Sequence, residues 1–224
     1  MFFKESKLNL LIVFMLVLMC SRSGLAQEKA RAPSQGPVYT GRERPVYAIL
    51  DFRPASVLIS PDVEEFETYY YTGSGWEYEE VDGDASWVPS LSAGVGFNTP
   101  INYIDVTFGG GSLLNSAAPT SFAFADLSVP FKLGSKVTLG PHFRPMYFSA
   151  PEWQGDSDVE FEDTAGWGVG AKVTAGGRRV SFCASVDYWD VEFDVEDDPT
   201  STWLAPDYLD YSGCAVQMGL LFRF

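Results

Sequence analysis

Apolar and polar residues alternate with a period of two through most of the chain after residue 44. The last segment shows this most clearly, and six apolar residues share one of its faces: Cys214, Val216, Met218, Leu220, Phe222 and Phe224. Small or polar residues such as Gly213, Gln217 and Arg223 occupy the other face. Successive side chains of a strand point to opposite sides, so the pattern predicts a β-strand between two different environments.

The same alternation recurs upstream. It covers residues 90–97, 103–109, 123–132, 137–147, 166–174 and 180–188. An eighth strand is predicted within residues 47–60, where Pro54 interrupts the pattern and leaves the assignment of its two faces open. Proline within a sheet favours edges and bulges, so we expect a β-bulge near Pro54.

The connections between these segments alternate in length. Residues 98–100, 134–135 and 175–178 make short turns, whereas residues 60–86, 115–120, 150–163 and 190–210 make longer loops. An even number of strands with short turns at one end and long loops at the other is typical of an up-and-down barrel. Strands of about ten residues with one apolar face match a bilayer-spanning barrel. The predicted fold is therefore all-β: an eight-stranded antiparallel up-and-down transmembrane β-barrel.

The composition of the two faces indicates which one is inside. The polar face is rich in Gly, Ala and Ser, and eight strands leave an interior just wide enough for side chains to fill. We therefore expect the apolar face to meet lipid, with the six Trp near the long loops and Phe97, Phe131, Phe222 and Phe224 at the opposite end as aromatic girdles. The alternative is a secreted lipocalin-like barrel, in which the apolar face would point inward.

The first residues predict a targeting segment. Lys4 and Lys7 precede an apolar run over residues 8–19, and small residues lead to Ala26. This is typical of a secretory signal peptide, so we expect a signal peptide over residues 1–26 with cleavage after Ala26. Residues 27–44 show no periodicity and predict a flexible periplasmic leader, followed by the barrel over residues 45–224.

The signal peptide, the eight alternating segments and the terminal residues GLLFRF together resemble small bacterial outer-membrane β-barrel proteins of the outer membrane protein A type. The resemblance covers residues 45–224. It implies a location in the cell outer membrane, with outer-membrane lipid and lipopolysaccharide as surroundings. In that family the last strand ends in an aromatic residue that the barrel assembly machinery recognises, which would make Leu220, Phe222 and Phe224 the assembly signal. We expect a monomer.

Charge is distributed unevenly along the chain, which has a formal net charge of −15. Residues 62–84, 152–163 and 190–210 hold 23 of the 30 Asp and Glu and no Lys or Arg. This polarity predicts long loops outside the cell, with the N-terminus and the short turns periplasmic. Such acidity disfavours nucleic acid as a partner, because phosphate is repelled.

The acidic loops have two interpretations. One is a solvated, like-charged surface that resists aggregation. The other is Ca²⁺ binding by Asp194, Glu196, Asp197 and Asp198, although these residues lack the EF-hand spacing and its central glycine. We expect no metal and no other cofactor, with Ca²⁺ in the loops as the alternative.

Seven charged side chains fall on the inward face: Asp105, Asp126, His142, Arg144, Lys172, Asp187 and Arg223. A buried charge is costly unless it is paired, so they predict an ion-pair network that fills the lumen. A gated ion path is the alternative. Some related barrels are lipid A-modifying enzymes, but His142 faces inward and no His-x-Ser pattern accompanies it, so we expect no enzyme.

The first long loop contains FETYYYTGSGWEYEE, in which a glycine-rich turn joins two aromatic arms. It predicts a hairpin that continues beyond the membrane. Five aromatic residues there could recognise an extracellular protein: Tyr69, Tyr70, Tyr71, Trp76 and Tyr78. They could equally rest at the headgroup level.

The sequence thus favours a non-enzymatic outer-membrane barrel with a structural or surface-interaction role. The alternatives are a small solute or ion channel of the porin kind and, behind it, a lipid A-modifying enzyme. Cys183 and Cys214 fall on opposite faces of neighbouring strands, so no disulfide is expected between them.

Overall fold

The structure is a computed structural model that describes residues 45–60, 67–80, 85–154, 159–177, 179–196, 203–204 and 207–224. The predicted signal peptide and leader lie outside these residues. No helix in the described ranges is long and apolar enough to cross a membrane.

Eight long strands form the main sheet. They are β1 (Val46–Ile59), β5 (Ser90–Asn98), β6 (Tyr103–Leu113), β7 (Thr120–Ser128), β9 (Val137–Phe148), β10 (Thr164–Gly176), β11 (Val180–Asp190) and β15 (Gly213–Arg223). Two short strands extend it: β4 (Ala85–Trp87) beside β1, and β8 (Phe131–Lys132) beside β9. The long loops add β2 (Glu67–Tyr71), β3 (Trp76–Glu80), β12 (Glu192–Asp194), β13 (Trp203–Leu204) and β14 (Tyr208–Asp210).

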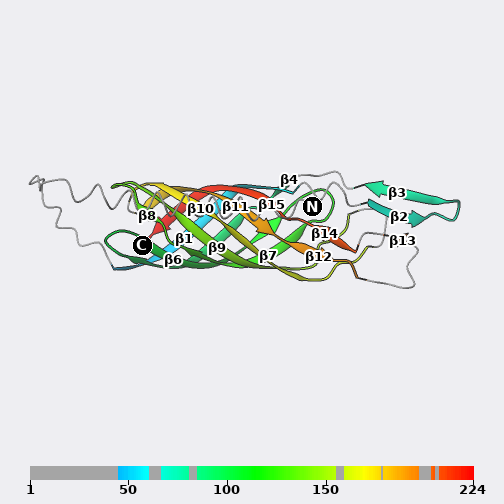
Figure 1. The fold of residues 1–224 in the computed structure, drawn as a ribbon, viewed down its shortest axis with the longest axis horizontal. Coiled ribbons are helices and arrows are strands. Elements are labelled where there is room, and N and C mark those ends of the chain that lie inside the picture. The colour runs from blue at the N-terminus through cyan, green and yellow to red at the C-terminus, as the bar shows by residue number, and fades with distance from the viewer. Residues whose placement is uncertain are drawn as a thin grey trace, which may run out of the picture. The chain divides into compact units, whose positions relative to one another are not determined.

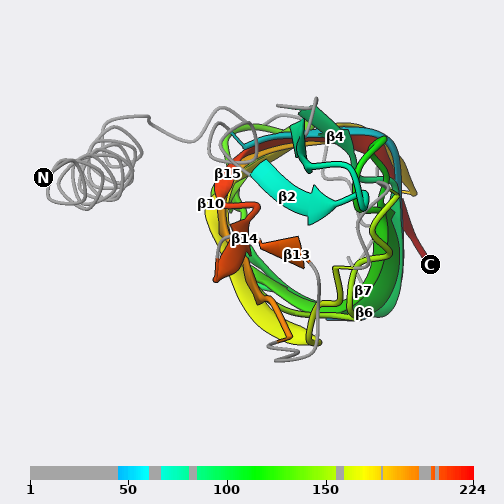
Figure 2. The ribbon, with the colours of Figure 1, turned by 90° about the vertical axis from the view of Figure 1, so that its right-hand side faces the viewer.

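The main sheet closes on itself. Sequential long strands pair antiparallel from β1 through β5, β6, β7, β9, β10, β11 and β15, and β15 pairs back with β1. Figure 2 shows the resulting ring from the loop end, and Figure 1 shows the same strands from the side. The predicted eight-stranded antiparallel up-and-down barrel is confirmed.

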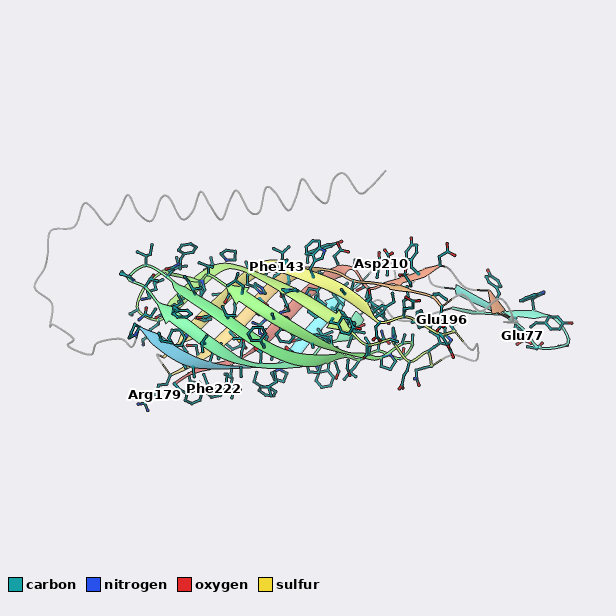
Figure 3. All side chains as sticks on the ribbon, turned by 90° about the horizontal axis from the view of Figure 1, so that it is seen from below. Glu77, Phe143, Arg179, Glu196, Asp210 and Phe222 are labelled. Carbon is teal, nitrogen blue, oxygen red and sulfur yellow. The ribbon has the colours of Figure 1, made fainter. Side chains whose placement is uncertain are left out.

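Burial alternates along the barrel strands, and the apolar side chains are the exposed ones. In β9 every second residue from Thr138 to Phe148 is buried, whereas Phe143 is 47% exposed and points outward from the barrel wall in Figure 3. The barrel strands are 9 to 14 residues long, enough to cross a bilayer at a tilt. This pattern is the opposite of a soluble barrel, whose apolar face would be buried.

A β-bulge in β1 determines which residues of this strand face inward, a point that the sequence left open. The register between β1 and β15 shifts between Phe52 and Ala55, which confirms the bulge expected at Pro54. The residues at 47, 49, 51 and 53 point inward before it, and those at 56, 58 and 60 point inward after it. The indole N–H of Trp87 donates to the carbonyl oxygen of Pro54 at 2.7 Å. This backbone acceptor of the bulge therefore has a hydrogen-bond partner.

Gly219 of β15 lies opposite this bulge. A Cβ added to it would come within 1.9 Å of the Phe52 carbonyl oxygen and 2.7 Å of the Arg53 Cα. Both contacts are with backbone, which cannot rotate away. The bulge that turns Arg53 into the barrel therefore requires glycine at position 219.

The interior at the loop end is apolar and aromatic. Phe122, Phe148, Trp189, Phe193 and Tyr211 are buried there and contact one another ring against ring, with centroids 5.1 to 6.4 Å apart. We call these five residues the aromatic layer. The expectation that all six Trp join a lipid-facing girdle is wrong for Trp153, which packs against the same buried cluster, and for Trp189. Its position shares the inward parity of Asp187, so its ring fills the barrel mouth.

The end of the chain is part of the closed sheet. The backbone N–H of Phe224 donates to the Ala48 carbonyl at 3.0 Å, and the Ala48 N–H donates to the Phe224 carbonyl at 3.2 Å. Cys183 is buried inside and Cys214 is exposed outside, and both are free thiols, as expected.

The glycine opposite the bulge gives a first prediction. Gly219→Ala should destabilise the barrel by about 1–3 kcal/mol, because the added methyl group would overpack against backbone. Gly134→Ala is the matched control, since nothing lies within 4 Å of a Cβ at that turn. Urea unfolding in lipid vesicles measures both variants. Equal midpoints for Gly219→Ala and the parent protein would contradict the assigned role of Gly219.

Candidate functional site

Charged side chains from five strands, and Gln217 from a sixth, meet in the middle of the barrel. Asp126 of β7 holds one end of this group. Its Oδ2 accepts from Arg144 Nη2 at 2.9 Å and from Arg53 Nη2 at 3.4 Å, and its Oδ1 lies 3.4 Å from Nδ1 of His142. All four side chains are almost completely buried. The carboxylate of Asp126 therefore interacts with three basic side chains.

Asp51 of β1 holds the other end. Its Oδ2 accepts from Arg53 Nη2 at 2.9 Å and from Lys172 Nζ at 2.8 Å. The thiol of Cys183 donates to its Oδ1 at 3.3 Å. Arg53 bridges the two carboxylates, and the bulge at Pro54 lets it face inward together with Ser56.

Asp187 and Gln217 complete the group. Asp187 is hydrogen-bonded to Nε2 of His142, and it accepts from the Ser185 hydroxyl at 3.0 Å. The side-chain oxygen of Gln217 accepts from Arg53 Nη1 at 2.6 Å and from Arg144 Nη1 at 2.7 Å. We call the eight residues of this group the central network: Asp51, Arg53, Asp126, His142, Arg144, Lys172, Asp187 and Gln217.

Space for these long side chains comes from small neighbours on the same wall. At Gly170 a Cβ would lie 2.2 Å from Oδ1 of Asp187, so the carboxylate occupies the volume that a larger residue would take. Arg144 is 1% exposed and Gln217 is fully buried. Three carboxylates, two guanidinium groups, one ammonium and one imidazole thus fill this section of the barrel.

A second polar group lies at the short-turn end. The Tyr47 hydroxyl donates to Asp105, which is buried. The guanidinium of Arg223 lies over the ring of Tyr103, 5.0 Å from its centroid, and donates to the Ser181 hydroxyl at 3.4 Å. This group uses aromatic rings and hydroxyls rather than direct ion pairs.

The structure thus divides the seven predicted lumen residues between two places. Asp126, His142, Arg144, Lys172 and Asp187 lie together in the central network, whereas Asp105 and Arg223 lie in the second group. Sequence reasoning missed Asp51 and Arg53, because the parity of β1 changes at the bulge. The signal available in the sequence was the pair of opposite charges at i and i+2, Asp51 and Arg53, just before Pro54.

The loop sheet is a three-stranded sheet in the order β13–β2–β3. The backbone N–H of Thr72 donates to Gly75 at 3.0 Å, and Gly73 has φ of +85°, so the turn between β2 and β3 uses the left-handed conformation that glycine tolerates. The predicted hairpin is present. Tyr69, Tyr71 and Trp76 are exposed, and Tyr70 and Tyr78 lie at register positions opposite Glu77 and Tyr69.

The acidic ribbon is formed by β12 and β14, with Glu192 opposite Asp210 and Asp194 opposite Tyr208. Partial burial, followed by the charges of Asp210, Asp194 and Asp190, raises the pKa of Glu192. Among the described residues no group of three or more His, Cys, Asp or Glu is placed to hold a metal ion. Asp194 and Glu196 of the Ca²⁺ alternative belong to this region, and Asp197 and Asp198 lie outside the described residues.

A carboxylate at the start of β10 shows the opposite shift. Asp163 accepts from the backbone N–H of Ala150 at 2.7 Å and from the Tyr147 hydroxyl at 2.8 Å. These two hydrogen bonds hold the pKa of Asp163 below its ordinary value. They tie the 150–163 loop to the end of β9.

A closed barrel of eight antiparallel strands, apolar outside and filled by polar side chains inside, defines a β-barrel of the outer-membrane class. Two solved structures resemble it: the solid-state NMR structure of outer membrane protein AlkL in DMPC lipid bilayers, and the crystal structure of Neisserial surface protein A (NspA). The first has 13% identity and a TM-score of 0.48, covering 86% of this chain and 97% of AlkL. The second has 13% identity and a TM-score of 0.42, covering 81% of this chain and 98% of NspA. No family model and no curated protein matches the sequence.

The central network gives a second prediction. Asp126→Ala leaves Arg144 and His142 without a carboxylate they share, and breaking a buried pair in this way costs about 3–5 kcal/mol. We expect the urea midpoint in lipid vesicles to fall accordingly. Asp207→Ala, at an exposed loop position, is the control and should shift the free energy of unfolding by at most about 0.5 kcal/mol. An unchanged midpoint for Asp126→Ala would show that the network does not stabilise the barrel.

The acidic ribbon gives a third prediction. Glu192 should titrate above its ordinary pKa of 4.5, because burial and three neighbouring carboxylates disfavour its charged form. Since the folded-state pKa is raised, its contribution to ribbon stability is complete below 4.5 and is lost as pH rises through the raised value. Carboxyl ¹³C NMR measures the midpoint, and Asp210→Asn should move it downward. A midpoint at or below the ordinary value would contradict this arrangement.

Proposed function

We propose that this protein is a closed, non-enzymatic barrel of the bacterial outer membrane whose activity is surface recognition by its loop end. The observation that carries the proposal is the filled interior. The second polar group, the central network and the aromatic layer follow one another along the barrel and occupy its interior with buried side chains.

The interior argues against a solute channel. An ion crossing the central network would have to separate Arg144 from Asp126 and Gln217, with which it makes hydrogen bonds of 2.9 and 2.7 Å. It would then meet the aromatic layer, whose five rings are buried against one another. Both steps carry a high barrier in a desolvated space.

The environment of His142 argues against catalysis at the one histidine. Nε2 faces Asp187, and Nδ1 faces Asp126 at 3.4 Å. Both ring nitrogens thus face carboxylates inside the barrel, and the side chain is 1% exposed. A general base needs its target within hydrogen-bond reach, which this burial denies to an external substrate.

The distribution of charge supports the orientation. Arg179 lies at the short-turn end in Figure 3, and Glu77, Glu196 and Asp210 lie at the loop end. We propose that the short turns and the N-terminus are periplasmic and that the acidic loops are extracellular. Outer-membrane lipid and lipopolysaccharide would then surround the barrel, and the protein would be a monomer, since the closed sheet leaves no barrel edge to pair.

The last strand supports a role in assembly. Leu220 and Phe224 are exposed on the outer face of β15, and Phe222 shares that face half-buried. We propose these three residues as the signal for the barrel assembly machinery. An extracellular protein ligand is the proposed partner of the loop sheet.

Planar-bilayer recording tests the proposal and gives a fourth prediction. The folded protein, verified by heat-modifiable migration, should produce no conductance steps above the bare bilayer. A variant with Arg144, Trp189 and Gln217 all replaced by Ala is the control, because it removes side chains from both filled sections and should conduct. Regular large steps from the unsubstituted protein would overturn the closed barrel and favour the channel.

A further inference from the structure

The loop sheet presents an aromatic face whose members are fixed by register. Tyr69 and Tyr71 are two residues apart in β2 and therefore lie on one face. Trp76 is directly opposite Tyr71, and their rings meet edge to face with centroids 5.7 Å apart. The turn at Thr72 and Gly75 closes the hairpin next to this pair, so the two rings are held in a defined arrangement.

These rings are exposed although they contact one another. Tyr69 is 42% exposed, Tyr71 50% and Trp76 57%. Figure 1 shows the hairpin beyond the ends of the barrel strands, and Figure 3 shows Glu77 at its far end. The outer apolar side chains gather on the barrel wall, and the hairpin with its aromatic face lies beyond the end of that wall.

The sequence on both sides of the hairpin carries charge of one sign. No Lys or Arg occurs between Arg53 and Lys132, whereas residues 62–84 hold nine Asp and Glu. The backbone register pairs Glu67 with Glu80. A segment whose charges all have one sign attracts partners of the opposite sign over long range.

Exposed aromatic faces and carboxylates are complementary to the same ligands. Ammonium and guanidinium groups bind over the faces of Trp and Tyr, and carboxylates pair with them. Along an extended chain, side chains on one face repeat about every 7 Å, which suits rings set two residues apart in a strand. A polypeptide can therefore place successive cations on Tyr69 and on the Tyr71–Trp76 pair.

We propose that the aromatic face of the β2–β3 hairpin binds an Arg- and Lys-rich polypeptide segment of another macromolecule. The inference rests on the proposed surface-recognition function and specifies its partner. Cation–π contacts with Tyr71 and Trp76 supply the selectivity, and the surrounding carboxylates supply long-range attraction.

The test uses the full chain in lipid nanodiscs and a fluorescent nona-arginine peptide, with binding followed by anisotropy at physiological salt. Tyr71→Ala with Trp76→Ala should weaken binding by about tenfold, as expected for two cation–π contacts. Tyr71→Phe with Trp76→Phe keeps an aromatic ring at both positions and should bind within about threefold of the parent protein. Tyr208→Ala removes an exposed tyrosine from the acidic ribbon and should have no effect.

A measurement on the unsubstituted protein tests the site without depending on whether the variants fold. Adding the peptide should shift the indole N–H resonance of Trp76 and leave that of the buried Trp189 in place. An unmoved Trp76 resonance, or equal affinities of the parent protein and the double Ala variant, would overturn the site. Displacement of the peptide by spermine at equal charge concentration would overturn the assignment to a polypeptide.

Bilayer recording on the same preparation separates the two claims. A silent barrel that fails to bind the peptide overturns this inference alone. Large conductance steps overturn the closed barrel, whatever the peptide does.

Discussion

The barrel depends on the pairing of opposite charges at its centre. Removing each charge from water costs several kcal/mol, so these groups are tolerated only where each meets a partner. Arg53 and Arg144 share Gln217 and Asp126, and Lys172 meets Asp51, so residues far apart in the chain have to reach the same point. A one-residue slip of any contributing strand would turn its charges toward lipid. The network therefore fixes register as well as filling space.

Backbone features make room for these charges. The bulge at Pro54 brings Arg53 inward, and Gly219 accepts the displaced backbone of β1. Gly170 leaves the volume that Asp187 occupies. Because the interior is then filled, the surfaces that remain available to a partner are the outer wall and the two ends of the barrel. The wall is apolar and suited to lipid, and we propose the loop end as the surface that meets a partner.

The sequence predicted the parts of the fold that follow from a period of two. The alternation predicted the number of strands and placed His142, Arg144 and Lys172 together on one face. A barrel has one inside and one outside, and the composition of the two faces indicated that the apolar face points outward. The sequence could not place Asp51 and Arg53, since a bulge shifts parity by an amount that local composition does not reveal. It also misplaced Trp189, because proximity to a loop suggested a girdle while its parity turned it inward. The partition of the lumen charges into two groups depends on the register between strands, which alternation within one strand does not contain.

The middle of the barrel is filled and shielded from water. Water-edited solid-state NMR of the labelled protein in lipid bilayers tests this most directly. We expect contacts from the two His142 ring nitrogens to the carboxyl carbons of Asp126 and Asp187, and slow polarisation transfer from water to the side chains of Arg144 and Gln217. Transfer to these side chains as fast as to the exposed Ser74 turn would contradict it, because it would show water passing through the barrel.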